Sequence, residues 1–170
     1  MTRLALLIAL AAVGCGSPAP SPDPISATAR NSDFELVFSL PRSTWRTSDA
    51  IEGEAVLSVL SPDLTSISGS GPVAFRFTAE GIVVEPARPA SCERFAIASD
   101  VPIPTGIERS GSISPDDGSH PFDADWFRDP ELHLPPGAWR IEAIAEFYVG
   151  SDCEGPLHVL NAGVDLTVVD

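Results

Sequence analysis

Residues 138–149 read AWRIEAIAEFYV and carry the clearest structural signal in the chain. One set of alternate residues is wholly apolar and comprises Trp139, Ile141, Ala143, Ala145, Phe147 and Val149. The other set is mostly polar and comprises Arg140, Glu142, Ile144, Glu146 and Tyr148. Because successive side chains of a strand point to opposite faces, this stretch predicts a long β-strand with one face in a core.

Shorter alternating stretches lie on both sides of this strand, over residues 34–40, 55–59, 73–78, 94–97 and 164–169. Residues 82–84 form a short, fully apolar run. Turn-forming residues separate them, at Ser61-Pro62-Asp63, Gly69-Ser70-Gly71, Pro135-Pro136-Gly137 and Asn161-Ala162-Gly163. No stretch has the spacing of an amphipathic helix, and 17 prolines and 13 glycines in 170 residues disfavour long helices. About seven strands predict a single all-β domain over residues 33–170, a two-sheet antiparallel β-sandwich.

The charge of the chain limits its partners. The chain has ten basic residues, all of them arginine, and 24 acidic residues, which gives a formal net charge of −14. A surface this acidic repels phosphate backbones, so we expect no nucleic-acid partner. For the same reason we expect no adsorption to anionic lipid through charge alone.

The N-terminal segment, residues 1–20, reads MTRLALLIALAAVGCGSPAP. Arg3 precedes ten apolar residues, 4–13, a run too short to span a bilayer and typical of a secretory signal peptide. The run ends in Ala12-Val13-Gly14-Cys15, which resembles the lipobox of bacterial lipoproteins, although that motif usually has leucine at the position of Ala12.

The lipobox resemblance implies that residues 1–14 are removed and that the Cys15 thiol accepts a diacylglyceryl group, with an N-acyl chain such as palmitate added after cleavage. Two or three acyl chains give stable membrane attachment. The protein is then exported and anchored at Cys15 to the bacterial cell membrane or, since Gly16 replaces the aspartate of an inner-membrane retention signal, to the outer membrane. Loss of Arg3 brings the net charge to −14 − 1 = −15. The alternative is a secreted protein without lipid at Cys15.

Residues 15–32 follow as the lipidated cysteine and a linker. Four prolines alternate here with small or polar residues, at Pro18, Pro20, Pro22 and Pro24. This composition predicts an extended, disordered tether between the membrane and the domain.

The closing part of the chain, about residues 132–169, shows a second resemblance. A Pro-Pro-Gly turn, a long alternating strand, a turn with Cys153 and a final strand are similar to the last strands of immunoglobulin-like domains on bacterial surface proteins. The resemblance implies an immunoglobulin-like β-sandwich. The Cys…Trp…Cys spacing of antibody domains is missing, so it concerns the architecture only.

With Cys15 assigned to lipid, Cys92 and Cys153 form an even pair. Outside the cytoplasm such a pair usually oxidises, so we predict a Cys92–Cys153 disulfide. Its chain-entropy contribution is about 4 kcal/mol. Neither cysteine lies in a CxxC motif or near a histidine, which disfavours a redox or metal role.

Residues 108–131 form an acidic stretch that we predict to be a surface loop. Its candidate binding residues are Asp116, Asp117, Asp123, Asp125, Trp126 and Phe127. Asp123 and Asp125 offer carboxylates to calcium, but the EF-hand spacing is missing, and a solvated acidic loop is the simpler interpretation. The aromatic pair either contacts a sugar or a partner protein, or fills the core under the loop.

Motifs for catalysis are missing, since the sequence has no nucleophile elbow, phosphate-binding loop or HExxH. His120, His133 and His158 lack metal-ligand spacing. We therefore expect no enzyme and no cofactor, and instead a non-catalytic binding or structural module of the cell envelope with a protein or glycan partner. Two alternatives stay open. Residues 49–56, DAIEGEAV, loosely resemble the bacterial intracellular proteinase inhibitor domain, and the 108–131 loop is a candidate calcium-dependent or hydrolytic site.

Overall fold

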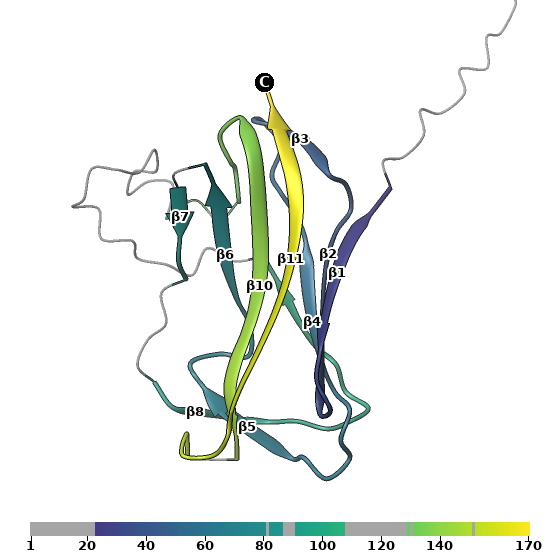
Figure 1. Cartoon of the computed structure of the whole chain (residues 1–170), viewed down its shortest axis with the longest axis vertical. Helices are drawn as coiled ribbons and strands as arrows, with labels where there is room; N and C mark the ends of the chain where they lie inside the picture. The colour runs from purple at the N-terminus through teal and green to yellow at the C-terminus, as the bar shows by residue number, and fades with distance from the viewer. Residues whose placement is uncertain (1–22, 81, 87–90, 108–128, 130, 151) are drawn as a thin grey trace, which may run out of the picture.

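The chain forms an all-β sandwich of two sheets (Figure 1). The computed structural model describes residues 23–80, 82–86, 91–107, 129, 131–150 and 152–170. The strands are β1 (Ile25–Arg30), β2 (Phe34–Leu40), β3 (Thr44–Arg46), β4 (Glu54–Val59), β5 (Ser66–Gly69), β6 (Ala74–Ala79), β7 (Ile82–Val84), β8 (Glu93–Ala96), β9 (Ile103–Gly106), β10 (Gly137–Val149) and β11 (Leu157–Val169). The prediction of an all-β sandwich is confirmed.

The first sheet has the strand order β1-β2-β4-β9, and all of its pairs are antiparallel. Strand β2 lies inside it and alternates as its sequence FELVFSL predicts. Phe34, Leu36, Phe38 and Leu40 are buried, while the residues between them are half-buried. This sheet therefore contributes to the core from one face of β2 and β4.

The second sheet is built on the hairpin of β10 and β11, each 13 residues long. Their register runs from Gly137 opposite Val168 to Tyr148 opposite Leu157. Two strands share the far edge of β10: β6 pairs with its first half and β5 with its last two residues. On the other side, β3 pairs with the end of β11 in parallel, and every other pair in this sheet is antiparallel.

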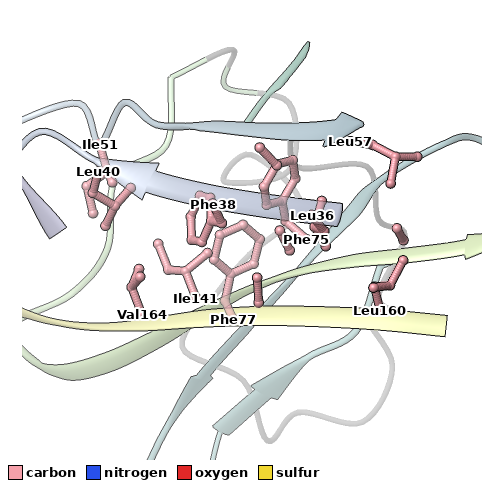
Figure 2. Packing of buried hydrophobic residues seen from close by; sticks show 14 of the residues in the cluster. Leu36, Phe38, Leu40, Ile51, Leu57, Phe75, Phe77, Ile141, Leu160 and Val164 are labelled. Carbon is pink, nitrogen blue, oxygen red and sulfur yellow. The ribbon is translucent and has the colours of Figure 1, made fainter. Parts of the chain in front are cut away.

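Aromatic side chains fill the space between the sheets (Figure 2). Phe34 of the first sheet meets Phe147 of the second edge to face, with ring centroids 4.7 Å apart. The ring centroids of Phe38 and Phe75 lie 5.7 Å apart, with the two ring planes tilted by 57°. Burial of each such ring contributes roughly 1.5–3 kcal/mol, so the core stabilises the sandwich from both faces.

The predicted linker, residues 15–32, is wrong over Ile25–Arg30, because these residues form strand β1. The sequence ISATAR alternates, and Ile25, Ala27 and Ala29 pack partly buried against the core while the strand pairs with β2. Alanine carries too little apolar surface to mark a strand by periodicity alone. The folded domain thus begins at Ile25, and residues 1–22 lie outside the described part of the chain.

The turn predicted at Asn161-Ala162-Gly163 is also wrong. These residues lie in the middle of β11, opposite Glu142, Ala143 and Ile144 of β10. Gly163 serves here to leave space and not to bend the chain, because a Cβ at this position would come within 2.6 Å of Nη2 of Arg140. The Arg140 side chain on the neighbouring strand β10 therefore explains the glycine at residue 163, which the sequence pattern had assigned to a turn.

The predicted number of strands was too low, because β1, β3, β5 and β9 were not expected. The strands that were predicted are confirmed, and β10 begins one residue before its predicted start.

Figure 1 shows how the ends of the sandwich differ: β1 enters at the end where β11 finishes, whereas β5, β8 and the β10–β11 connection lie at the opposite end. We call the latter the hairpin end.

Candidate functional site

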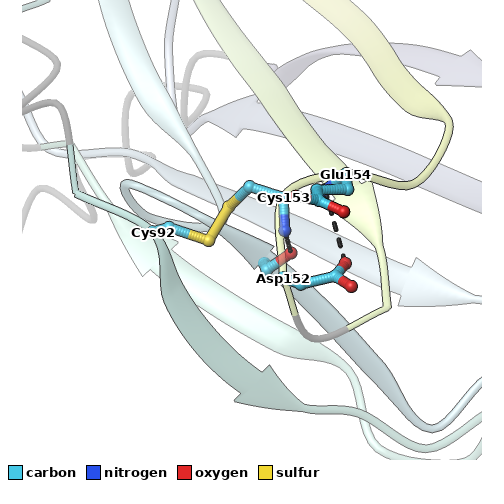
Figure 3. The surroundings of a disulfide bond; sticks show 5 residues. Cys92, Asp152, Cys153 and Glu154 are labelled. Atoms are coloured by element: carbon cyan, nitrogen blue, oxygen red, sulfur yellow. Dashed lines mark hydrogen bonds between the residues drawn. A yellow bond between two sulfur atoms is a disulfide. The ribbon is translucent and has the colours of Figure 1, made fainter.

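A disulfide between Cys92 and Cys153 lies at the hairpin end, as predicted. The two sulfurs are 2.03 Å apart, and the Cα atoms are 6.1 Å apart across 61 residues of sequence. The bond joins the chain entering β8 to the connection between β10 and β11 (Figure 3). It therefore fastens the edge strand β8, and with it the short strand β5, to the long hairpin.

Ser68 in β5 stabilises the β10–β11 connection. Its side chain is fully buried in β5, and its hydroxyl accepts a hydrogen bond from the backbone amide of Cys153 at 3.0 Å. Cys153 has a φ of 54°, in the left-handed region that residues with a side chain rarely adopt. The disulfide and the Ser68 hydrogen bond together fix this unusual backbone.

A groove of about 240 Å³ opens beside the disulfide. Its lining comprises Gly69, Ser70, Ser91, Cys92, Glu146, Tyr148, Cys153 and Leu157. The hydroxyl oxygen of Ser91 is buried and has no hydrogen-bond partner among the described residues. A buried hydroxyl without a partner costs free energy.

Apolar side chains continue from the groove across the outer face of the hairpin. Leu157 is 51% exposed and Val159 is 56% exposed. The register places Leu157 opposite Tyr148 and Val159 opposite Glu146, so all four side chains share the outer face. We call these four residues with the groove the hairpin patch.

A second concavity, of about 450 Å³, lies on the outer face at the opposite end of the same sheet. Arg140 borders it and bonds Asp165 at 3.1 Å and Glu142 at 3.3 Å. Glu142 in turn lies 3.4 Å from Arg76. Hydrogen bonding to Asp165 raises the pKa of Arg140 further above its ordinary range. The charges here neutralise each other, so this concavity presents no unpaired arginine to a ligand.

Most of the predicted site residues lie outside the described part of the chain. They are Cys15, Asp116, Asp117, Asp123, Asp125, Trp126 and Phe127. Of the acidic stretch, the structure describes only Asp129 and Glu131. Glu131 lies 3.3 Å from His133. The described residues contain no group of three or more potential metal ligands.

Residues 49–56, which resemble a proteinase inhibitor, lie partly in a turn and partly in β4. The Asp49 carboxylate accepts hydrogen bonds from the Arg42 side chain at 2.9 Å and from the Arg46 amide at 3.0 Å. Ile51 is buried in the core. Asp49 and Ile51 thus stabilise the sandwich, and the resemblance stays a prediction.

The fold and this site define the class of protein: a two-sheet β-sandwich whose second sheet carries a disulfide that joins the start of β8 to the β10–β11 connection. No protein-family model, curated protein or solved structure matches the chain. The immunoglobulin-like topology therefore stays a prediction. Nowhere in the described residues is there an apolar helix of membrane-spanning length.

Sequence reasoning missed the hairpin patch. It placed Tyr148 on the outer face of its strand but assigned no role to Ser91, Leu157 or Val159. The available signal was the apolar pair Leu157 and Val159 in alternation, which the false turn at Asn161-Ala162-Gly163 separated from the rest of β11. Recognising the long strand would have put both residues on the solvent face.

Proposed function

We propose that the protein is an exported bacterial lipoprotein, anchored to a membrane through Cys15, whose sandwich is a non-catalytic binding module of the cell envelope. The observation that carries the proposal is the use of the cysteines. Cys92 and Cys153 form a disulfide, a bond typical of oxidising compartments. Cys15, the third cysteine, directly follows an apolar leader in a lipobox-like sequence.

The position of β1 supports an orientation for this module. Ile25 lies ten residues after Cys15, which at ~3.1 Å per residue is a reach of roughly 30 Å. The tether is thus shorter than the sequence analysis expected. Because β1 enters at the end opposite the hairpin end, a membrane-anchored domain turns the hairpin end away from the lipid (Figure 1). That placement favours the hairpin patch as the binding surface.

The test is the intact mass of the full chain purified from the membranes of a bacterial host. We expect a polypeptide that begins at Cys15 and carries acyl chains, and that stays in the membrane fraction after a high-salt wash. The matched variant is Cys15→Ser, which keeps the other two cysteines and is expected in the soluble extracytoplasmic fraction. An intact starting methionine without acyl mass would overturn the proposal.

A further inference from the structure

We propose that the Cys92–Cys153 disulfide is a reversible latch, which a dithiol reductant opens in the folded protein, and that its reduction releases the edge strand β8 from the β10–β11 connection. The inference goes beyond the proposed function and does not depend on the lipid anchor. The cysteine pair acts here as the substrate of a reductant, and that role needs no CxxC motif.

The disulfide can be reached from solvent. Cys92 is exposed and Cys153 is half-buried, and both residues line the groove beside the bond (Figure 3 shows the pair). Exposed disulfides exchange with thiols more readily than buried ones, because the attacking thiolate must reach a sulfur atom. The sulfur of Cys92 is therefore the one that a reductant meets first.

Reduction proceeds in two exchange steps. A thiolate of the reductant attacks Sγ of Cys92 and forms a mixed disulfide, while the bond between the two cysteines breaks and its electron pair leaves on Sγ of Cys153. The second thiol of the reductant then attacks its own sulfur in the mixed disulfide and frees Cys92. The reductant leaves as a cyclic disulfide, and its two electrons and two protons end on the two cysteines, which become thiols.

The two ends of β8 are attached in different ways. At one end Ile97 is buried, and its backbone amide donates to the carbonyl oxygen of Thr65 at 3.0 Å. At the other end the disulfide of Cys92 joins it to the hairpin. Between them, three of the four residues of β8 are exposed. We call residues 91–97 the strap, and its hinge is then at Ile97 and its latch at Cys92.

Strand β5 is the only described strand that pairs with the strap. All four residues of β5 are buried, and the strand also pairs with the last two residues of β10. Because of this burial, β5 stays in the sheet when the strap lifts. Reduction therefore opens the hydrogen bonds between β5 and β8 and leaves the two-sheet core closed.

The latched state carries two free-energy costs that release would remove. The Ser91 hydroxyl, directly before Cys92, is buried without a hydrogen-bond partner among the described residues, and it would reach water when this end of the strap lifts. Cys153 is the one described residue other than glycine with a positive φ. Strained backbone of this kind concentrates at sites that change conformation. After reduction, only the hydrogen bond to Ser68 still holds the Cys153 backbone.

The first test is reduction of the folded full chain, purified in detergent, by the small dithiol dithiothreitol. Iodoacetamide traps free thiols, and peptide mass identifies them at Cys92 and Cys153, separately from Cys15. We expect a reduction rate that rises in proportion to the dithiothreitol concentration and exceeds the rate of global unfolding, measured by denaturant jumps on the same preparation. A rate that levels off at the unfolding rate would overturn the proposal, since the bond would then open only in the unfolded chain.

The second test is hydrogen exchange of the protein held reduced by dithiothreitol. We expect exchange to rise in β8, in its partner β5 and in the β10–β11 connection, and to stay unchanged in β2. An exchange pattern equal to that of the oxidised protein contradicts a latch. Loss of the whole fold on reduction contradicts it too, because the bond would then be a permanent structural link.

Ser91→Ala tests the cost of the latched state. The substitution removes the buried hydroxyl, so in a buffer of reduced and oxidised dithiothreitol it should shift the equilibrium towards the disulfide at least about fivefold. Ser99→Ala, at an exposed position beyond the hinge, is the matched control and should leave the equilibrium unchanged. No shift with Ser91→Ala, or an equal shift in both variants, would count against the release of the strap.

Discussion

The hydroxyl of Ser68, fully buried in β5, accepts a hydrogen bond from the amide of Cys153, 85 residues further along the chain. The hydrogen bond holds the β10–β11 connection against β5, directly beside the disulfide. Replacing Ser68 with alanine leaves that amide without its partner, and an unsatisfied buried donor costs about 1–3 kcal/mol. Denaturant unfolding of Ser68→Ala should show a loss of this size. The control Ser99→Ala, at an exposed position, should change stability by less than about 0.5 kcal/mol.

Removal of the disulfide should have a larger effect. Its loop of 61 residues predicts a loss of about 4 kcal/mol for Cys92→Ser with Cys153→Ser, measured as free energy of unfolding. Hydrogen exchange should rise first in β5 and β8, because the bond fastens those short strands to the hairpin. Unchanged exchange in β5 and β8 would show that the strands are held by other contacts.

Arg140 and Gly163 should behave as a coupled pair. A Cβ at residue 163 displaces the Arg140 guanidinium, which is partly exposed, so Gly163→Ala should cost less than about 1 kcal/mol. In an Arg140→Thr background the same substitution should cost little or nothing, and a double-mutant cycle measures the difference. Gly106→Ala in β9 is the control, since a Cβ there meets nothing within 4 Å. Additive effects at residues 140 and 163 contradict the close approach.

The stabilisation that Arg140 provides should not change with pH near neutrality. Hydrogen bonding to Asp165 raises the pKa of Arg140. A raised pKa in the folded state gives stability that is fully present below the unfolded value and is lost only as pH rises through the folded value. For arginine that window lies above about pH 12. The stability difference between wild type and Arg140→Thr should therefore be constant from about pH 6 to pH 9 in chemical denaturation.

His158 should carry its proton on Nε2. The Asn31 side-chain oxygen accepts hydrogen bonds from the amides of Asp33 at 2.9 Å and Phe34 at 2.8 Å, so its NH₂ group faces Nδ1 of His158 at 3.4 Å. A donor there requires Nδ1 to be the acceptor of a neutral ring. Long-range nitrogen NMR should show this tautomer. Asn31→Asp keeps both amide bonds and removes the donor, so it should shift the proton towards Nδ1. Identical spectra for the two proteins would contradict the assignment.

The alternation of large side chains predicted much of the fold. Strands β2, β4 and β10 could be predicted because apolar residues stand at every second position along each of them. Strand β1 was missed because alanine gives a faint pattern, and β3 because three residues are too few to show one. The middle of β11 was misread since Gly163 suits both a turn and a crowded strand, and only the neighbouring Arg140 distinguishes them.

Less of the candidate site could be predicted. With Cys15 assigned to lipid, two cysteines remain and allow a single pairing, so the cysteine count was sufficient to predict the Cys92–Cys153 disulfide. The groove could not be found in this way, since its walls come from four separate segments, around residues 70, 91, 147 and 155. Their proximity depends on β5 pairing with only the last two residues of β10, a register that no local sequence feature specifies.

Strand β11 sets the time at which this protein can fold. It contacts β1, β2, β3 and β10, and it follows all of them in the sequence. At ~5–20 residues per second, a ribosome needs roughly 6–26 s to proceed from the end of β2 to the end of β11. During that interval β2 lacks its contacts with β11. The nascent chain therefore stays without a closed core until its synthesis has passed residue 169.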